Sequence, residues 1–134
     1  MPKKILIADD DINLRGAYKI LFSSEYDVVE ASNGRELVEK AFEVKPDIII
    51  TDIVMPALSG YRAIQKLDRD KKFKNTVVVF NSGNITDQDI YEMHKPKNMH
   101  SVFIDKPFNK KDLSKKIEYL INKLEKSREG SGQD

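Results

Sequence analysis

Four aspartates are the residues of this chain best suited to chemistry, because each follows a short apolar run. Asp9, Asp10 and Asp11 come directly after one such run, and Asp52 comes one residue after another. A single acid at such a position is typical of a cap on the following helix. Several carboxylates brought to one edge of a sheet repel one another unless a cation neutralises them. Oxygen ligands without histidine or cysteine favour Mg²⁺ or Mn²⁺, so the pattern indicates a site for one of these ions.

The sequence also contains the other groups that a carboxylate nucleophile such as Asp52 needs to form an acyl phosphate. Such a site requires a metal, a cationic side chain, and a hydroxyl or backbone donor around the phosphoryl group. Lys106 supplies the cation, Ser82 the hydroxyl, and Gly83 an accessible backbone amide. Each of the three alone is typical of an ordinary turn. Their occurrence together with Asp52, after successive apolar runs, is what indicates a phosphoryl site. The acids disfavour a flavin or nucleotide site, because carboxylates without a cation repel phosphate.

The elements that must position these side chains alternate along the chain. Short runs rich in β-branched residues predict strands buried on both faces, at residues 4–8, 27–31, 47–51, 76–81 and 101–104. Apolar residues at helical spacing predict helices near residues 12–23, 34–44, 59–69, 86–94 and 110–126. This α/β alternation implies a doubly wound parallel sheet with helices on both faces. Ligands of such sheets bind at the carboxyl ends of the strands, where the acids, Ser82 and Lys106 fall.

Length and composition limit the number of domains and the classes of partner and site. The 134 residues suit one domain, expected over residues 1–126 with a disordered tail at 127–134. A formal net charge of +1 disfavours direct nucleic-acid binding, and no apolar stretch is long enough to insert into a membrane. The chain has no cysteine, which excludes disulfides and thiolate metal sites. A cytoplasmic location is expected.

With these motifs in place, the sequence resembles the receiver domain of two-component response regulators over about residues 3–126. The resemblance rests on the acids with the run before them, on the segment from Asp52 to Pro56 with Ser59 and Gly60 beyond it, and on the residues that follow the last two strands. These residues are 7–11, 52–56, 59–60, 82–83 and 106–108. It implies a flavodoxin-like fold with strand order 2-1-3-4-5. Alternation alone leaves that order open.

The resemblance also implies roles for the metal and phosphoryl groups. Asp52 would be phosphorylated, and Mg²⁺ would be held by Asp52, Asp10, Asp9 and the backbone carbonyl of Val54. Asp10 would be the direct carboxylate ligand, and Asp9 would act through water. The phosphoryl group itself would be surrounded by four residues, namely Ser82, Gly83, Lys106 and Val54.

A conformational switch is implied as well. Ser82 matches the switch hydroxyl and Phe103 the switch aromatic of the family. A cis peptide between Lys106 and Pro107 is a further expectation. The chain departs from the family at Asn81, which is polar where the family is usually apolar, and in residues 89–100, which lack the usual alanines. The segment from Ile85 to His100 is predicted to be the least regular and most mobile part of the domain, and to contact partners together with the basic last helix.

The resemblance implies a signalling module rather than an enzyme. The partners would be a histidine kinase or histidine phosphotransfer protein and an unknown downstream protein, with the chain itself a monomer or weak dimer. Two alternatives stay open on the residues. One is a haloacid-dehalogenase-like phosphatase with Asp9 as nucleophile and Asp11 two residues on. The other is a receiver that docks without being phosphorylated.

Overall fold

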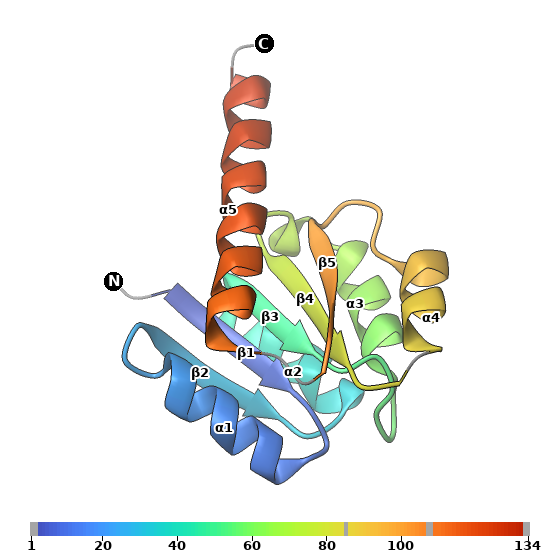
Figure 1. Cartoon of the computed structure of the whole chain (residues 1–134). Coiled ribbons are helices and arrows are strands. Elements are labelled where there is room, and N and C mark those ends of the chain that lie inside the picture. The colour runs from blue at the N-terminus through green and yellow to red at the C-terminus, as the bar shows by residue number, and fades with distance from the viewer. Residues whose placement is uncertain (1–2, 85, 107–108, 133–134) are drawn as a thin grey trace.

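Five parallel strands form one sheet in the order β2-β1-β3-β4-β5 (Figure 1). The computed structural model describes residues 3–84, 86–106 and 109–132. The strands are β1 (Lys3–Ala8), β2 (Tyr26–Ala31), β3 (Ile48–Thr51), β4 (Val77–Ser82) and β5 (Ser101–Asp105). The predicted doubly wound, flavodoxin-like α/β fold and its strand order are confirmed.

Helices follow the strands in turn. They are α1 (Ile12–Phe22), α2 (Gly34–Val44), α3 (Gly60–Asp68), α4 (Asp87–His94) and α5 (Lys110–Gly132). A short 3₁₀ turn, η1 (Lys71–Phe73), follows α3 and was not predicted. None of the helices in the described ranges combines the length and the hydropathy that a membrane span needs.

The two faces of the sheet are covered by different helices (Figure 1). α1 and α5 pack over one face, where Tyr18 and Ile117 join alternate strand residues in one buried cluster. α2, α3 and α4 pack over the other, where Leu37, Ile64 and Tyr91 join the remaining strand residues. Every residue of β3 and β4 is buried. Up to their polar last residues, these strands are therefore continuous apolar runs rather than alternating ones, because both of their faces need apolar side chains.

The register of the strands brings the site residues to one edge. Ala8 of β1 pairs with Thr51 of β3, so the acids that follow these strands become neighbours. The backbone N–H of Asp52 donates to the carbonyl of Ala8 at 3.1 Å. On the other side, the N–H of Lys106 donates to the carbonyl of Ser82 at 2.9 Å, which brings the ends of β4 and β5 together.

α5 is longer than the sequence predicts. The apolar stripe ends at Leu124, so a helix ending near residue 126 and a disordered tail were expected. In the structure the helix continues to Gly132 and extends past the sheet (Figure 1). Residues 123–129 are mostly Lys, Glu, Arg and Leu, which favour helix without tertiary packing. α5 thus includes residues 127–132, the domain limit expected at residue 126 stays a prediction, and 133–134 lie outside the described residues.

Candidate functional site

Three carboxylates converge at the carboxyl edge of the central strands. Asp9, Asp10 and Asp52 each offer one oxygen, and these atoms lie within 4.8 Å of one another. Asp9 is buried, Asp52 is partly buried and Asp10 is exposed, so the cluster opens to solvent on one side. An open, all-oxygen set of this size fits Mg²⁺, which binds through a few carboxylates and keeps several waters. The structure therefore brings together the three acids that the sequence proposed as metal ligands.

Lys106 supplies the positive charge of the site from the end of β5. Its Nζ donates to Asp9 Oδ2 at 3.0 Å and to Asp52 Oδ2 at 3.3 Å. Burial lowers the pKa of Lys106, but the hydrogen bond to Asp9 and the charges of Asp52 and Asp9 outweigh burial and raise this pKa above its usual value. Lys106 is therefore a fixed cation between the two acids.

The ionised form of Asp52 is disfavoured despite this partner, because its pKa is raised above the usual value. Burial raises the pKa of Asp52, the charge of Lys106 lowers it, and the nearby charge of Asp9 raises it again, with a net increase. Asp52 Oδ1 also accepts from the N–H of Ile53 at 2.7 Å. One lysine thus does not fully offset the crowded acids, and a bound cation would favour the ionised form.

The loop after Asp52 is held by a close backbone approach. A Cβ at Gly60 would lie 1.7 Å from the carbonyl oxygen of Asp52, so only glycine fits there. The N–H of Gly60 donates to the carbonyl of Ile53 at 2.8 Å, which fixes the start of α3 against this loop. Val54 lies in the same loop and its side chain is 53% exposed. The metal contact expected from the Val54 carbonyl stays a prediction.

Ser82, Gly83 and Phe103 lie on the β4–β5 side of the site. The Ser82 hydroxyl donates to the carboxylate of Asp87, at the start of α4. A Cβ at Gly83 would lie 3.6 Å from the Cβ of Lys106, which places this glycine beside the lysine. Phe103 is half-buried, and its ring centroid lies 5.7 Å from that of Tyr91. The roles expected for these residues in phosphoryl binding and switching stay predictions. The expected cis peptide falls on Pro107, outside the described residues.

Two residues near the acids were not assigned a role from the sequence. Arg15 Nη1 donates to the carbonyl of Asp9 at 2.6 Å, and its Nε donates to Glu30 at 3.3 Å. Arg15 thereby fixes the turn that carries the acids, but an arginine inside a helical stretch gave no signal of this. Asp11 caps α1 by accepting from the N–H groups of Asn13 and Leu14. Capping is the ordinary role that the sequence suggests for a single acid at this position, and Asp11 is the one of the three acids that has it.

A buried polar pair lies beneath the site. Asn81 Nδ2 donates to the hydroxyl of Tyr18, and both side chains are about 1% exposed. Burial raises the pKa of Tyr18, the hydrogen bond from Asn81 opposes this, and the charges of Asp9 and Asp52 add to the increase. The pair therefore satisfies the amide nitrogen of Asn81 at the end of β4, whereas the buried Oδ1 of Asn81 has no hydrogen-bond partner among the described residues. Tyr18 belonged to an apolar helical stripe in the sequence, which gave no sign of the use of its hydroxyl.

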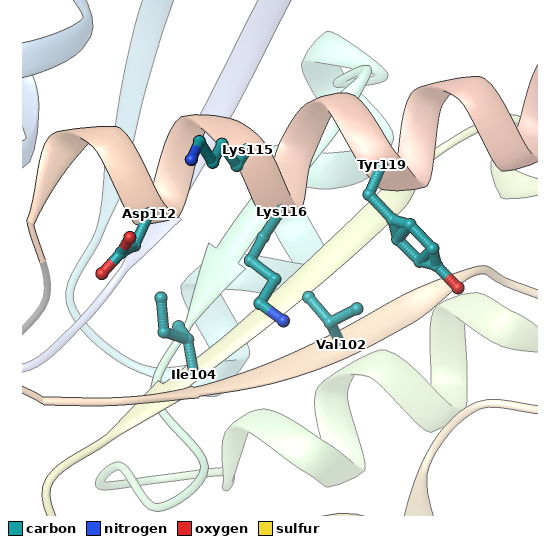
Figure 2. A pocket seen from close by; sticks show the side chains of 6 residues that line it. All are labelled: Val102, Ile104, Asp112, Lys115, Lys116 and Tyr119. Atoms are coloured by element: carbon teal, nitrogen blue, oxygen red, sulfur yellow. The ribbon is translucent and has the colours of Figure 1, made fainter.

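A second feature lies between β5 and α5 and shares no residue with the acidic cluster. It is a hollow of about 610 Å³, and Figure 2 displays the six side chains that line it, namely Val102, Ile104, Asp112, Lys115, Lys116 and Tyr119. The two β5 residues give it an apolar floor. Lys116 and Tyr119 extend from α5 toward that floor (Figure 2). Two lysines against one aspartate give its rim a positive charge.

Comparisons with known proteins bear on this geometry. The family model described as response regulator receiver domain matches residues 5–118. The chemotaxis protein CheY of Thermotoga maritima is 46% identical over 69 residues, which are 50% of this chain and 58% of that protein. Hybrid signal transduction histidine kinase D of Dictyostelium discoideum is 28% identical over 117 residues, 87% of this chain and 7% of the kinase. The chain thus spans less than two thirds of the length of these curated relatives.

Solved structures give the same picture of the fold. A response regulator receiver domain protein (CheY-like) from Methanospirillum hungatei aligns with a TM-score of 0.80 at 23% identity, covering 95% of this chain and 99% of that one. The chemotaxis response regulator CheY4 of Vibrio cholerae aligns with a TM-score of 0.77 at 25% identity, covering 90% and 99% of the two chains.

Proposed function

This chain belongs to the response regulator receiver family, a family of signalling domains rather than catalytic enzymes, and we propose that Asp52 accepts a phosphoryl group in a magnesium-dependent reaction. The observation that carries the proposal is the bridge from Lys106 Nζ to both Asp9 and Asp52, beside a third carboxylate of the same cluster. This arrangement combines a nucleophile, a fixed cation and an oxygen-ligand set in one partly open site.

Each residue has a role in the proposed transfer. A carboxylate oxygen of Asp52 forms a bond to phosphorus while the P–N bond of a donor phosphohistidine breaks, and the electron pair returns to the imidazole. Asp9, Asp10, Asp52 and the Val54 carbonyl would hold Mg²⁺, which neutralises charge on the carboxylates and the phosphoryl oxygens when bound. Lys106 would contact the phosphoryl oxygens as a second cation beside Mg²⁺.

We propose that phosphorylation changes the conformation of Ser82 and Phe103. The Ser82 hydroxyl and the Gly83 amide would donate to the phosphoryl oxygens, and Phe103 would turn inward into the space that Ser82 leaves. Phe103 is half-buried against Tyr91, so an inward turn would bury further apolar surface. A fluorinated Phe103 should change its fluorine resonance when beryllofluoride, a phosphoryl mimic, is added with Mg²⁺. An unchanged resonance would contradict the switch.

Mapping the phosphate tests the transfer itself. The chain is incubated with a small phosphodonor, with Mg²⁺ or with a chelator, and the modified residue is identified by mass spectrometry. We expect one phosphate on Asp52, none in Asp52→Asn, and little with the chelator. Phosphate on Asp9 instead would support the phosphatase alternative, although Asp11, the second acid that this alternative needs, is engaged in capping α1. A chain that takes no phosphate would be a docking receiver.

The partners follow from the same proposal. A histidine kinase or histidine phosphotransfer protein would supply the phosphoryl group, to a monomer or weak dimer in the cytoplasm. We place the downstream contact on α4, β5 and α5, including the hollow of Figure 2, and its lysine rim favours an acidic segment of a protein partner. A photocrosslinker at Tyr119 should capture such a segment. Charge reversal of Lys115 and Lys116 should abolish the capture, whereas reversal of Lys123, outside the hollow, should leave it intact.

A further inference from the structure

The Ser82 hydroxyl, which the proposed function assigns to the phosphoryl group, is already engaged elsewhere. Ser82 ends β4 and is 3% exposed, and its hydroxyl donates to Asp87 Oδ2. The Ser82 Oγ also accepts from the N–H of Asn84 at 3.3 Å. Asp87 is the first residue of α4 and is itself only 4% exposed. A buried carboxylate and a buried hydroxyl thus satisfy each other across the β4–α4 connection.

A serine hydroxyl carries one proton, so Ser82 cannot donate to Asp87 and to a phosphoryl oxygen at the same time. We propose that Asp87 is a positioning residue that holds the Ser82 hydroxyl away from the phosphoryl site and thereby opposes the activated conformation. This inference rests on the proposed function, and it adds a competitor for the switch hydroxyl that belongs to this chain's own α4. The bond is charge-assisted and therefore among the stronger hydrogen bonds of a protein.

The exchange of partners has a consequence for α4. When Ser82 turns to the phosphoryl group, Asp87 loses its hydroxyl donor while still buried, and the loss of a donor from a buried carboxylate is costly. The first turn of α4 must then move so that Asp87 reaches water. The far half of the helix has separate anchors, because the Tyr91 hydroxyl lies 3.0 Å from the Ser101 hydroxyl and its ring packs on Phe80 and Phe103. Asp87 thus converts occupancy of the site into a displacement of the start of α4.

A simpler role for Asp87 is to favour the helix dipole, as acids in a first turn do. The chain provides the control for this reading. Asp89 lies in the same first turn with the same charge, but it is exposed. Removing Asp89 tests the dipole alone, whereas removing Asp87 tests the dipole together with the bond to Ser82.

The test titrates the full chain with beryllofluoride in the presence of Mg²⁺ and follows the amide resonances of Gly83 and Asn84. Asp87→Ala should reach half-saturation at roughly tenfold lower beryllofluoride than the natural sequence, since a bond that stabilises only the inactive form is gone. Asp89→Ala should stay within about twofold. If Asp87→Ala does not fold, Asp87→Asn replaces it, with a smaller gain because the amide is a weaker acceptor.

A double-mutant cycle separates positioning from a merely structural role. In a Ser82→Ala background, the further change Asp87→Ala should no longer improve beryllofluoride binding, because the competition for the hydroxyl has been removed. The proposal is overturned if Asp87→Ala behaves like Asp89→Ala, or if its gain persists without the Ser82 hydroxyl.

Failure of the phosphoryl site and failure of the Ser82–Asp87 contact give different results. If the natural sequence does not bind beryllofluoride at Asp52, the proposed function fails, and the contact is judged on the ligand-free protein. Asp87→Ala should then still accelerate amide exchange at Ile90 and Tyr91 more than Asp89→Ala does. Equal exchange in the two variants would overturn the contact's role in holding α4.

Discussion

The edge that carries the acids and the helix that follows Ser82 are held in place in opposite ways. The acids follow β1 and β3, and every residue of β3 is buried between two helical layers. In α4, by contrast, only two of eight residues are buried, Asp87 and Tyr91. The chemical groups therefore lie on the part of the fold that is fixed by many apolar contacts. The part that can respond is fixed by fewer apolar contacts, mainly those of the Tyr91 ring, and by a few polar contacts that can exchange partners.

The contrast has an energetic reason. Apolar packing around a parallel sheet has no alternative arrangement of similar energy, since a slip in register would expose buried faces. A hydroxyl–carboxylate bond such as Ser82–Asp87 has an alternative as soon as another acceptor arrives. A receiver needs both regions: a rigid site that fixes the donors and ligands, and a weakly held element whose position a single new bond can change.

Breaking the rigid region should have the largest effect. Gly60→Ala would place a Cβ 1.7 Å from the Asp52 carbonyl oxygen, and backbone on both sides of this contact must shift. We expect a loss of roughly 3 kcal/mol in the free energy of unfolding by urea, together with slower phosphorylation, because the Asp52 loop moves.

Gly16→Ala is the matched control for this change. Apart from its chain neighbours and the nearby backbone of α1 itself, no heavy atom of the described residues lies within 4 Å of a Cβ at Gly16, which lies inside α1. Alanine favours helix over glycine, so this variant should gain about 0.5–1 kcal/mol. Equal effects of the two substitutions would mean that the contact between α3 and the Asp52 loop is softer than the geometry indicates.

Removing the cation should have the next largest effect. Lys106→Ala leaves the buried Asp9 without its charged partner, which should cost about 2 kcal/mol in unfolding free energy with a chelator present. Mg²⁺ should restore much of this loss, since it neutralises the same carboxylates. Lys110→Ala, whose exposed ion pair with Glu25 spans 3.8 Å, should change stability by less than about 0.5 kcal/mol. A loss that Mg²⁺ does not restore would argue against a shared site.

The sequence predicts the acidic edge of the sheet better than it predicts the contacts of α4. The strands and the convergence of Asp9 with Asp52 were predictable, because buried β-branched runs and the carboxyl-edge rule act locally. The strand order came from the family resemblance, since alternation alone allows several orders. Asp87 was not predicted as the partner of Ser82, because an acid in a first helical turn already has a sufficient local explanation. The hydroxyl of Tyr18 was missed for a similar reason, since its ring fits an apolar stripe.

Amide hydrogen exchange measures the contrast directly. The segment around α4 was predicted to be the least regular part of the domain, and the structure gives it a regular helix at Asp87–His94 with few buried residues. We expect the amides of Ile90 to Met93 to exchange at least about tenfold faster than those of Ile117 to Leu120 in α5, a difference of about 1.4 kcal/mol in opening free energy. Beryllofluoride should change exchange in α4 more than in α5. Equal protection, unchanged by activation, would place the responsive element elsewhere.

The smallest expected effect concerns the anchor at the far half of α4. Tyr91→Phe removes the hydroxyl that lies 3.0 Å from Ser101, which should cost about 1 kcal/mol in unfolding free energy at pH 7. Burial raises the pKa of Tyr91, and this outweighs the lowering by the Ser101 hydrogen bond and by Lys95. The unfolded chain therefore loses the phenol proton first, so this tyrosine's stabilising contribution is present below about pH 10 and declines above it.

Phenylalanine has no such proton, and the deficit of Tyr91→Phe relative to the natural sequence should shrink between pH 9 and about 11. Ser101→Ala is the control, since it removes the same bond but keeps the ionising phenol, and its deficit should not shrink. A Tyr91→Phe deficit that is the same at both pH values would mean that the phenol of α4 already lies in water, and that this helix is anchored even more weakly than the structure indicates.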